Sequence, residues 1–227
     1  MNKDKWKFEH LINNLERSSS KDSIFNYKSG RTAFLSLGQG NIDEWLDTLL
    51  PNTRLILEPK IIGSNIGLQY INGKLHKSIN KNSEDITDKI KFIRTIPQNI
   101  SVNERIEIRG VLYFDNISVK NNKHESIDIT KASTEYNQIK YCVFQIFNCK
   151  INHFQALQEL KKLDFEIPDT QFTNFISDIG IYLKCWKAGK LFQSYPTNGL
   201  VLKINSKKLQ KYLGENNLTR NWAYAIN

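Results

Sequence analysis

Apolar residues along this chain recur with two periods, and each period predicts a different kind of element. Alternating or short continuous apolar runs are typical of β-strands, whereas apolar residues three and four positions apart are typical of an amphipathic helix. The first pattern predicts strands at 54–58, 66–70, 74–79, 105–114, 140–149, 199–205 and 221–226. The second predicts helices at 4–18, 41–50, 153–163, 178–189 and 206–213.

Turn signals indicate how these elements connect. Asn72 and Gly73 lie between two predicted strands, and an Asn-Gly pair favours a type I′ turn, so the two strands are predicted to form a hairpin. The polar stretch RSSSKDS (17–23) predicts a linker after the first helix. Strands mixed with helices and joined by hairpin turns predict an α+β fold with antiparallel sheets.

The composition allows a sizeable core and a basic surface. The chain has 227 residues, of which 40% are hydrophobic and 11% aromatic, enough for one large domain or two small ones. The formal net charge of +9 attracts polyanions such as nucleic acid, nucleotides or acidic membranes. Because the lysines are scattered along the chain, the charge by itself leaves simple solubility open as its explanation.

The cysteines, the histidines and the apolar runs show no pattern of a disulfide framework, a metal site or a membrane span. Cys142, Cys149 and Cys185 fit neither a disulfide framework nor a C-x-x-C metal site, so we predict buried free thiols and a cytoplasmic protein. No apolar run approaches 18 residues, so no membrane span is expected. The histidines show no metal-ligand spacing and are predicted to be exposed. They are His10, His76, His124 and His153.

Lys60 is the first candidate for chemistry. It follows a proline in the apolar stretch LILEPKII, where partial burial would favour the neutral, nucleophilic amine. Glu58 stands two positions earlier, so we expect it on the same strand face, where its carboxylate could orient the amine. The alternative is a Glu–Lys pair on a solvated sheet face, and this stretch alone favours the alternative.

Arg109 and Lys203 each place a positive charge in an apolar strand. Both could bind a phosphate. Taken singly, each is better explained as a cationic side chain at the end of a strand. No Gly-rich phosphate loop, Ser/His/Asp order or zinc pattern accompanies them.

Taken in order, several stretches resemble one family. They are FLSLGQGN, LEPKIIGSNIGLQYINGKL, SEDITDKIKFIRTIPQNI, IEIRGVLYF, YCVFQIFN, YPTNGLVLKINS and LGENNLTRNWAYAI. Their order is similar to that of the adenylation (nucleotidyltransferase) domain of NAD⁺-dependent DNA ligases, over about residues 34–227. The specificity lies in the ordered set, since no single motif would suffice.

The resemblance implies a fold and a division of the chain. The expected fold is a ligase-type nucleotidyltransferase core of antiparallel sheets flanked by helices, ATP-grasp-like, without an OB-fold. This core would occupy residues 36–227, after a short N-terminal helical segment and linker at 1–35.

The resemblance also implies an activity. In the family a lysine attacks the α-phosphate of NAD⁺, forms lysyl-AMP and passes AMP to the 5′-phosphate of a nick in duplex DNA. Lys60 matches this lysine in the K-x-D-G motif, Glu58 matches a carboxylate that helps to bind adenine, and Lys203 matches a phosphate-contacting lysine. The implied nucleotide-binding residues are Ser36, Leu37, Glu58, Gly63, Arg109, Lys203 and Trp222.

Several family positions carry a different residue. The aspartate of K-x-D-G is Ile62, and the glutamate of R-G-E is Val111. Asn198 replaces a metal-binding carboxylate, so it is a candidate metal ligand that would hold Mg²⁺ weakly. A lysine of the last motif falls about where Asn227 stands. Losing one positioned charge typically costs about 2.7–4 kcal/mol in barrier, so reduced activity is predicted.

Functions of different classes stay open. The first is an enzyme that adenylates Lys60, with NAD⁺ or ATP as AMP donor, Mg²⁺, nicked DNA as partner and a separate OB-fold protein. The second is a non-catalytic pseudoenzyme that binds nucleic acid or a nucleotide. The third is a structural subunit that uses the fold as a scaffold.

Overall fold

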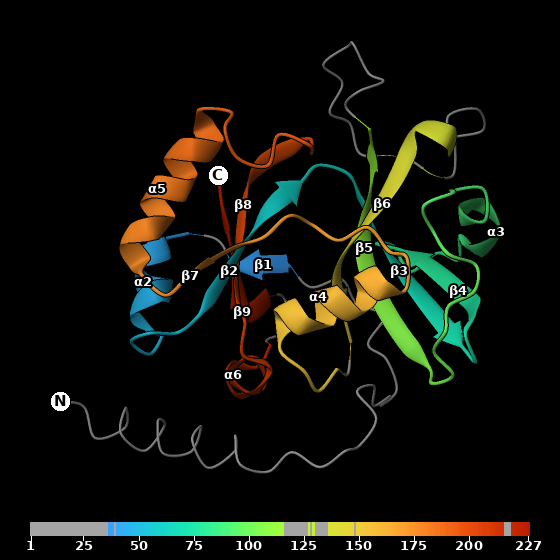
Figure 1. The fold of residues 1–227 in the computed structure, drawn as a ribbon, viewed down its shortest axis with the longest axis horizontal. Coiled ribbons are helices and arrows are strands. Elements are labelled where there is room, and N and C mark those ends of the chain that lie inside the picture. The colour runs from blue at the N-terminus through green and yellow to red at the C-terminus, as the bar shows by residue number, and fades with distance from the viewer. Residues whose placement is uncertain are drawn as a thin grey trace.

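Two β-sheets form the frame of the protein (Figure 1). The computed structural model describes residues 36–38, 40–115, 127, 129, 136–147, 149–215 and 219–227. One sheet has the order β1 (Ser36–Gly38), β9 (Thr219–Ile226), β8 (Thr197–Ile204), β2 (Leu55–Ile61) and β7 (Gln171–Thr173). The other has the order β4 (Lys74–Asn80), β3 (Ser64–Ile71), β5 (Ile106–Phe114) and β6 (Ile139–Ile146). Strand pairs are antiparallel except β1 with β9, which is parallel.

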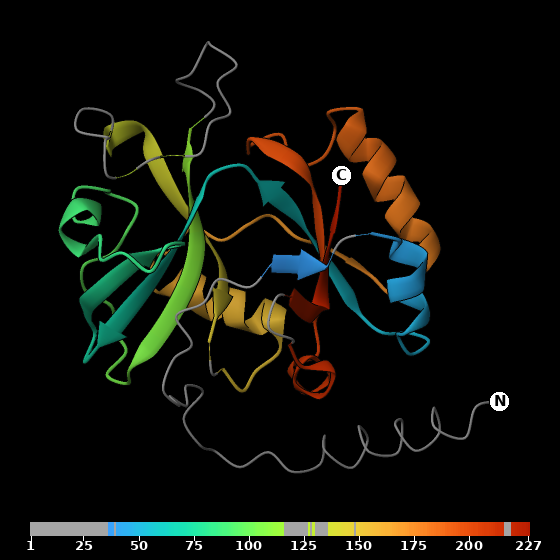
Figure 2. The same cartoon turned by 180° about the vertical axis from the view of Figure 1, so that it is seen from behind.

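The helices lie around these sheets. They are α2 (Ile42–Asp47), α3 (Thr87–Ile90), α4 (His153–Lys162), α5 (Ile176–Lys187) and α6 (Lys207–Leu213), with a 3-10 turn at Tyr136–Gln138. Helices α2 and α5 cover the outer side of the five-stranded sheet, and α3 lies beside β4 (Figures 1 and 2). Together these elements confirm the predicted α+β class with antiparallel sheets.

Local signals placed most of these elements correctly. Asn72 and Gly73 both have positive φ, 50° and 73°, as a type I′ turn requires, and they join β3 to β4 as predicted. Helix α2 ends at Asp47, earlier than expected. The three-residue strands β1 and β7 and the four-residue α3 were not predicted, because such short segments carry no measurable period. The helix predicted at 4–18 and its linker lie outside the described residues.

The two faces of β5 pack into two different cores. Ile106, Ile108 and Leu112 belong to a cluster formed with β3, β6 and α4. Val111 and Tyr113 belong to a second cluster formed with β2, β8 and β9. Since side chains alternate along a strand, the face that carries Val111 is directed to the space between the two sheets. The polar residues discussed below lie on this face or on strands that border it.

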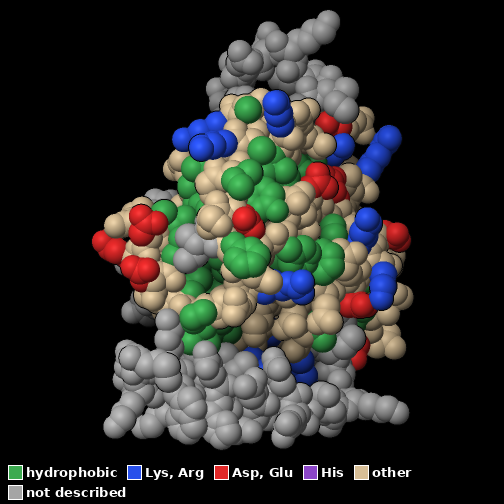
Figure 3. All heavy atoms as spheres, turned by 60° about the vertical axis from the view of Figure 1, so that its left-hand side comes forward, with side chains coloured by type: hydrophobic (Ala, Val, Ile, Leu, Met, Phe, Trp, Pro, Cys, Tyr) green, Lys and Arg blue, Asp and Glu red, His purple; other side chains and the backbone are tan. Residues whose placement is uncertain are grey.

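Most of the cysteines are buried, and some apolar side chains lie on the surface. Cys142 and Cys149 are buried as predicted, whereas Cys185 on α5 is only half-buried. Hydrophobic side chains gather on the face over α2 and α5, with charged residues around them (Figure 3). Phe175 and Ile181 are more than half exposed in this region. Among the described residues, no helix combines the length and apolarity needed to cross a bilayer.

Candidate functional site

Strand β2 carries Glu58 and Lys60, but the two side chains have different partners. Opposite β8, the pairing register shifts between Pro59 and Ile61, so Lys60 lies in an irregular step of the ladder. The half-buried Lys60 amine donates a hydrogen bond to Oδ1 of Asn227, at 2.7 Å. The expected Glu58–Lys60 contact is therefore replaced, since the carboxylate of Glu58 is bound elsewhere.

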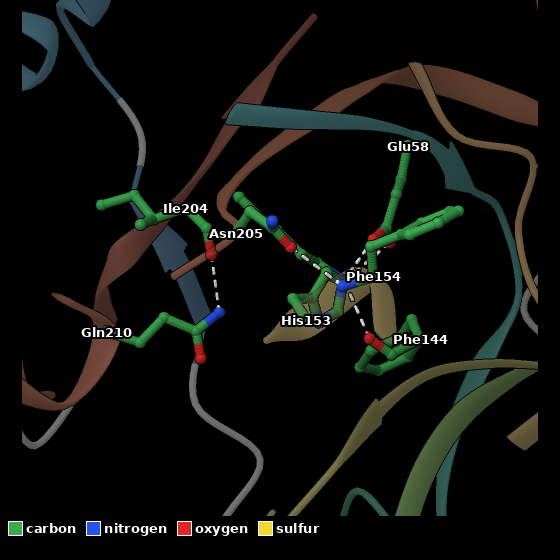
Figure 4. Close-up of polar contacts among 8 residues, drawn as sticks. Glu58, Phe144, His153, Phe154, Ile204, Asn205 and Gln210 are labelled. Atoms are coloured by element: carbon green, nitrogen blue, oxygen red, sulfur yellow. Dashed lines mark hydrogen bonds and ion pairs between the residues drawn. The ribbon is translucent and has the colours of Figure 1, made fainter. Parts of the chain in front are cut away.

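Glu58 is the centre of a buried polar cluster that includes Lys203 and His153. Lys203 Nζ lies 2.7 Å from Oε2 of Glu58 and also donates to the carbonyl oxygen of Phe144 at 2.9 Å. His153 Nε2 lies 2.5 Å from Oε1 (Figure 4). Glu58 is paired with Val201 across the sheet, two positions before Lys203, so the two charged side chains lie diagonally on one sheet face.

The burial of His153 contradicts the prediction that it is exposed. Only 6% of this side chain is accessible. It is the first residue of α4, and its backbone N–H donates to the carbonyl of Asn205, directly after β8. The side chain of Asn205 accepts from the N–H of Phe154 (Figure 4). These contacts fix the start of α4 so that the imidazole faces Glu58, which is 95 positions away in sequence.

Burial and neighbouring charge shift the ionisation of this cluster. Burial alone would raise the pKa of Glu58, but Lys203 and His153 together lower it. Burial lowers the pKa of His153, Lys203 lowers it further, and Glu58 only partly opposes them. At neutral pH the cluster thus holds an ionised Glu58 and a neutral His153. Because an ionised carboxylate only accepts, the proton of the imidazole is on Nε2, which donates to Glu58.

We expect the protein to lose stability in acid through this cluster. The pKa of His153 is lower in the folded state, so below about pH 6.5 the unfolded chain binds the proton more readily and folding is disfavoured. Glu58 adds to the loss at lower pH, below its unfolded pKa. Urea unfolding at pH 8, 7, 6 and 5 should show the fall. His153→Gln should flatten it between pH 6.5 and 5, and the exposed His76→Gln serves as the control for removing one imidazole.

Arg109 lies in the middle of β5 and not at a strand end, whereas Lys203 is next to last in β8; both side chains are buried. Arg109 is fully buried on β5, with Nη2 3.3 Å from Oε1 of Glu107 and its guanidinium carbon 4.5 Å from the centroid of the Phe147 ring. Burial lowers the pKa of Arg109, while Glu107 opposes the shift. Lys203 is 4% exposed. Both cations lie between the sheets, in ion pairs with buried carboxylates.

The remaining candidate residues lie on the strands around this cluster. Ser36 and Leu37 pair with Thr219 and Arg220 of β9. Trp222 is buried, with the guanidinium carbon of Arg220 5.7 Å from its ring centroid.

Backbone packing explains one family position directly. A Cβ at Gly63 would lie 2.0 Å from the carbonyl oxygen of Leu112, so only glycine allows the turn from β2 into β3 to touch β5. Val111, whose methyl group would be 2.8 Å from the same Cβ, fills the adjacent space.

The structure brings the predicted residues together in two groups. Glu58 and Lys203 are in contact, and Lys60 contacts Asn227 instead of either of them. Trp222 and His153 line one small cavity of about 10 Å³, which has room for about one water molecule. Its other lining residues include Gln145, Lys207 and Gln210. The sequence prediction missed His153 as a site residue, and no local pattern could have revealed its long-range partner.

The donors for a metal ion are sparse. Asn198 is exposed at the start of β8, and its amide is neutral. No group of three His, Cys, Asp or Glu side chains that could hold an ion is present in the part of the chain that the structure describes. These residues do not fit a protein-built Mg²⁺ site. Asn198 stays a prediction.

Comparisons with known proteins show similarity to the same family that the motifs resemble. The family model described as the NAD-dependent DNA ligase adenylation domain matches residues 39–138. The DNA ligase of Mycoplasma capricolum subsp. capricolum is 28% identical, over 86% of this chain and 35% of its own length. The DNA ligase of Thermotoga maritima is 26% identical, over 75% of this chain and 29% of its own length. The chain thus spans about a third of the length of the curated relatives it matches.

Solved structures share the fold at lower identity. A Lig E DNA ligase aligns with a TM-score of 0.55 and 10% identity, over 87% of this chain and 69% of that one. An archaeal ATP-dependent RNA ligase aligns with a TM-score of 0.51 and 13% identity, over 77% of this chain and 45% of that one. These likenesses confirm the ligase-type nucleotidyltransferase core.

Proposed function

Because the chain is a divergent homologue of the adenylation domain of NAD-dependent DNA ligases, we propose that Lys60 accepts AMP from NAD⁺ and passes it to the 5′-phosphate of nicked duplex DNA. The position of the Lys60 amine carries this proposal. It is half-buried near the end of β2, outside the regular ladder, on the side where β8 begins and β9 ends.

The reaction requires the Lys60 amine to attack with its lone pair and to lose a proton. Its lone pair must attack the α-phosphorus, which forms a P–N bond and breaks the P–O bond to nicotinamide mononucleotide. One amine proton must leave, so the neutral form has to be available. ATP is the alternative AMP donor, with pyrophosphate as its leaving group. Lys60 then holds AMP until an oxygen of a DNA 5′-phosphate attacks the AMP phosphorus. This attack forms a P–O bond and breaks the P–N bond, so the Lys60 amine leaves and regains a proton.

Two features support a low rate. Glu58 and Lys203 neutralise each other in a buried pair, and either residue must leave that pair to contact a nucleotide. Removing one partner of a buried pair typically costs about 3–5 kcal/mol, so opening it opposes nucleotide binding. Val111 is buried and apolar where the family has a carboxylate, and supplies no polar contact.

A second function is favoured by the charge of the chain. The net charge of +9 and the closed ion pairs suit a non-catalytic module that binds nucleic acid in the cytoplasm without loading AMP. In the enzymatic function a separate OB-fold protein is an expected partner.

Intact-mass spectrometry separates the two functions. We expect wild-type protein incubated with Mg²⁺ and NAD⁺ to gain the mass of one AMP, slowly, and Lys60→Ala to gain none, since no other residue is proposed as acceptor. Lys74→Ala, which removes an exposed lysine from β4, is the matched control and should load like wild type. A parallel reaction with ATP identifies the donor.

The contrary result is equally clear. If wild-type protein gains no AMP from either donor, the enzymatic proposal fails. DNA binding should then be measured across salt concentrations, because a steep loss of affinity with salt marks phosphate contacts.

A further inference from the structure

The hydrogen bond between Lys60 and Asn227 joins two residues 167 positions apart. Lys60 comes from the irregular step of β2, and Asn227 directly follows β9. β2 and β9 do not pair with each other, because β8 lies between them. For the two side chains to meet across the width of β8, the backbone must be held in place both at Lys60 and at Asn227.

The backbone holds both ends. After the irregular step, the N–H of Ile62 donates to the carbonyl of Pro196 at 2.7 Å. On the other side, Leu200 of β8 pairs with Ile226. Gly199 has φ of +155°, and a Cβ there would lie 2.1 Å from the carbonyl oxygen of Ile226 and 2.8 Å from Oδ1 of Asn227. The lack of a side chain at 199 therefore allows Asn227 to reach over β8 to Lys60.

The charged groups of these strands have other partners. Glu58 and Lys203 bind each other, and Arg220 lies 3.7 Å from Glu215. Tyr224 stacks on Trp45. Thr197 and Asn198 at the start of β8 are uncharged. Among the described residues of β2, β8 and β9 and Asn227 after them, Lys60 thus donates its hydrogen bond to a neutral amide.

We infer that Asn227 is a positioning residue for Lys60. By accepting one N–H, its oxygen fixes the direction of the amine and therefore of the lone pair that remains for attack. This inference rests on the proposed role of Lys60 as the AMP acceptor.

A charge series at position 227 tests the inference without relying on AMP transfer. The reactivity of Lys60 toward acetic anhydride is measured by peptide mass spectrometry across pH in wild type, Asn227→Asp and Asn227→Lys. Relative to wild type, we expect the midpoint to move up by about one pH unit with Asp and down by about one with Lys, as for a single charge at this distance near the surface. Lys74 in the same samples is the internal reference.

AMP loading is followed in the same proteins and in Asn227→Ala. Asn227→Ala should load AMP at least tenfold more slowly than wild type. For Asn227→Lys, the ratio of its loading rate to that of wild type should be highest near pH 7. Midpoints for Lys60 that coincide in all three proteins, or unchanged loading by Asn227→Ala, would overturn the positioning role while leaving AMP loading intact. Shifted midpoints with no AMP loading by any protein would instead overturn the proposed function and, with it, the positioning role in that reaction.

Discussion

Replacing Lys203 with methionine is expected to lower the free energy of unfolding by about 3–5 kcal/mol. Lys203 and Glu58 are 4% and 2% exposed, and their charged atoms are 2.7 Å apart. Methionine fills most of the space of the lysine stem but leaves the carboxylate of Glu58 buried with only the neutral His153 as recorded partner. Urea unfolding at pH 7.5 measures the loss.

A double-mutant cycle isolates the pair itself. Glu58→Gln removes the negative charge and keeps an oxygen that can accept from His153, so Glu58→Gln with Lys203→Met should regain much of the stability lost by Lys203→Met alone. If Lys203→Met costs less than 1 kcal/mol, as exposed ion pairs do, the pair is reached by water and the closed cluster is disproved. The cycle also measures how firmly the pair resists a nucleotide that competes for Glu58.

Arg109→Met is expected to have an effect of similar size, again about 3–5 kcal/mol. Arg109 is fully buried, stacks on Phe147 and pairs with Glu107, which is 3% exposed. Methionine removes the charge that faces Glu107 and the flat guanidinium that covers the ring. Arg109→Lys should recover only part of the loss, because an ammonium keeps the charge without the planar stacking. Thermal and urea unfolding check both variants.

Lys162→Met is the matched control for both buried pairs. Lys162 and Glu159 form an ion pair of 2.8 Å on the exposed side of α4. Because exposed pairs contribute little, this variant should unfold within about 0.5 kcal/mol of wild type. Equal losses for Arg109→Met and Lys162→Met would contradict the account of a charged layer sealed between the sheets.

The two buried ion pairs give the candidate site its character. The face of β5 and the strands opposite carry Glu107, Arg109, Glu58 and Lys203, and each cation already has a carboxylate partner. Such a layer can stay closed without a ligand, and it can open only if a nucleotide offers comparable contacts. Lys60, the proposed acceptor, is thus half-buried beside predicted binding residues that are fully buried.

The sequence by itself determined the longer elements, the hairpin and the resemblance to the adenylation domain of NAD⁺-dependent DNA ligases. Regular alternation and helical spacing are local properties, so β3, β5, β8, α4 and α5 follow from the residues within them. The Asn72-Gly73 turn also needs only its own two residues, because both adopt positive φ readily. The ordered motifs predict a ligase-type core, and they single out Lys60, Glu58, Arg109 and Lys203 without reference to any tertiary contact.

Tertiary structure decided which of these residues meet. His153 gave no local signal, since its burial depends on α4 docking at the end of β8 and on a carboxylate 95 positions earlier. The period of a regular strand predicted that Glu58 and Lys60 would act together, but the shifted register after Pro59 gave them separate partners. Side-chain period is encoded within a strand, whereas register, strand neighbours and burial depend on the whole sheet, and these set the chemistry available to Lys60.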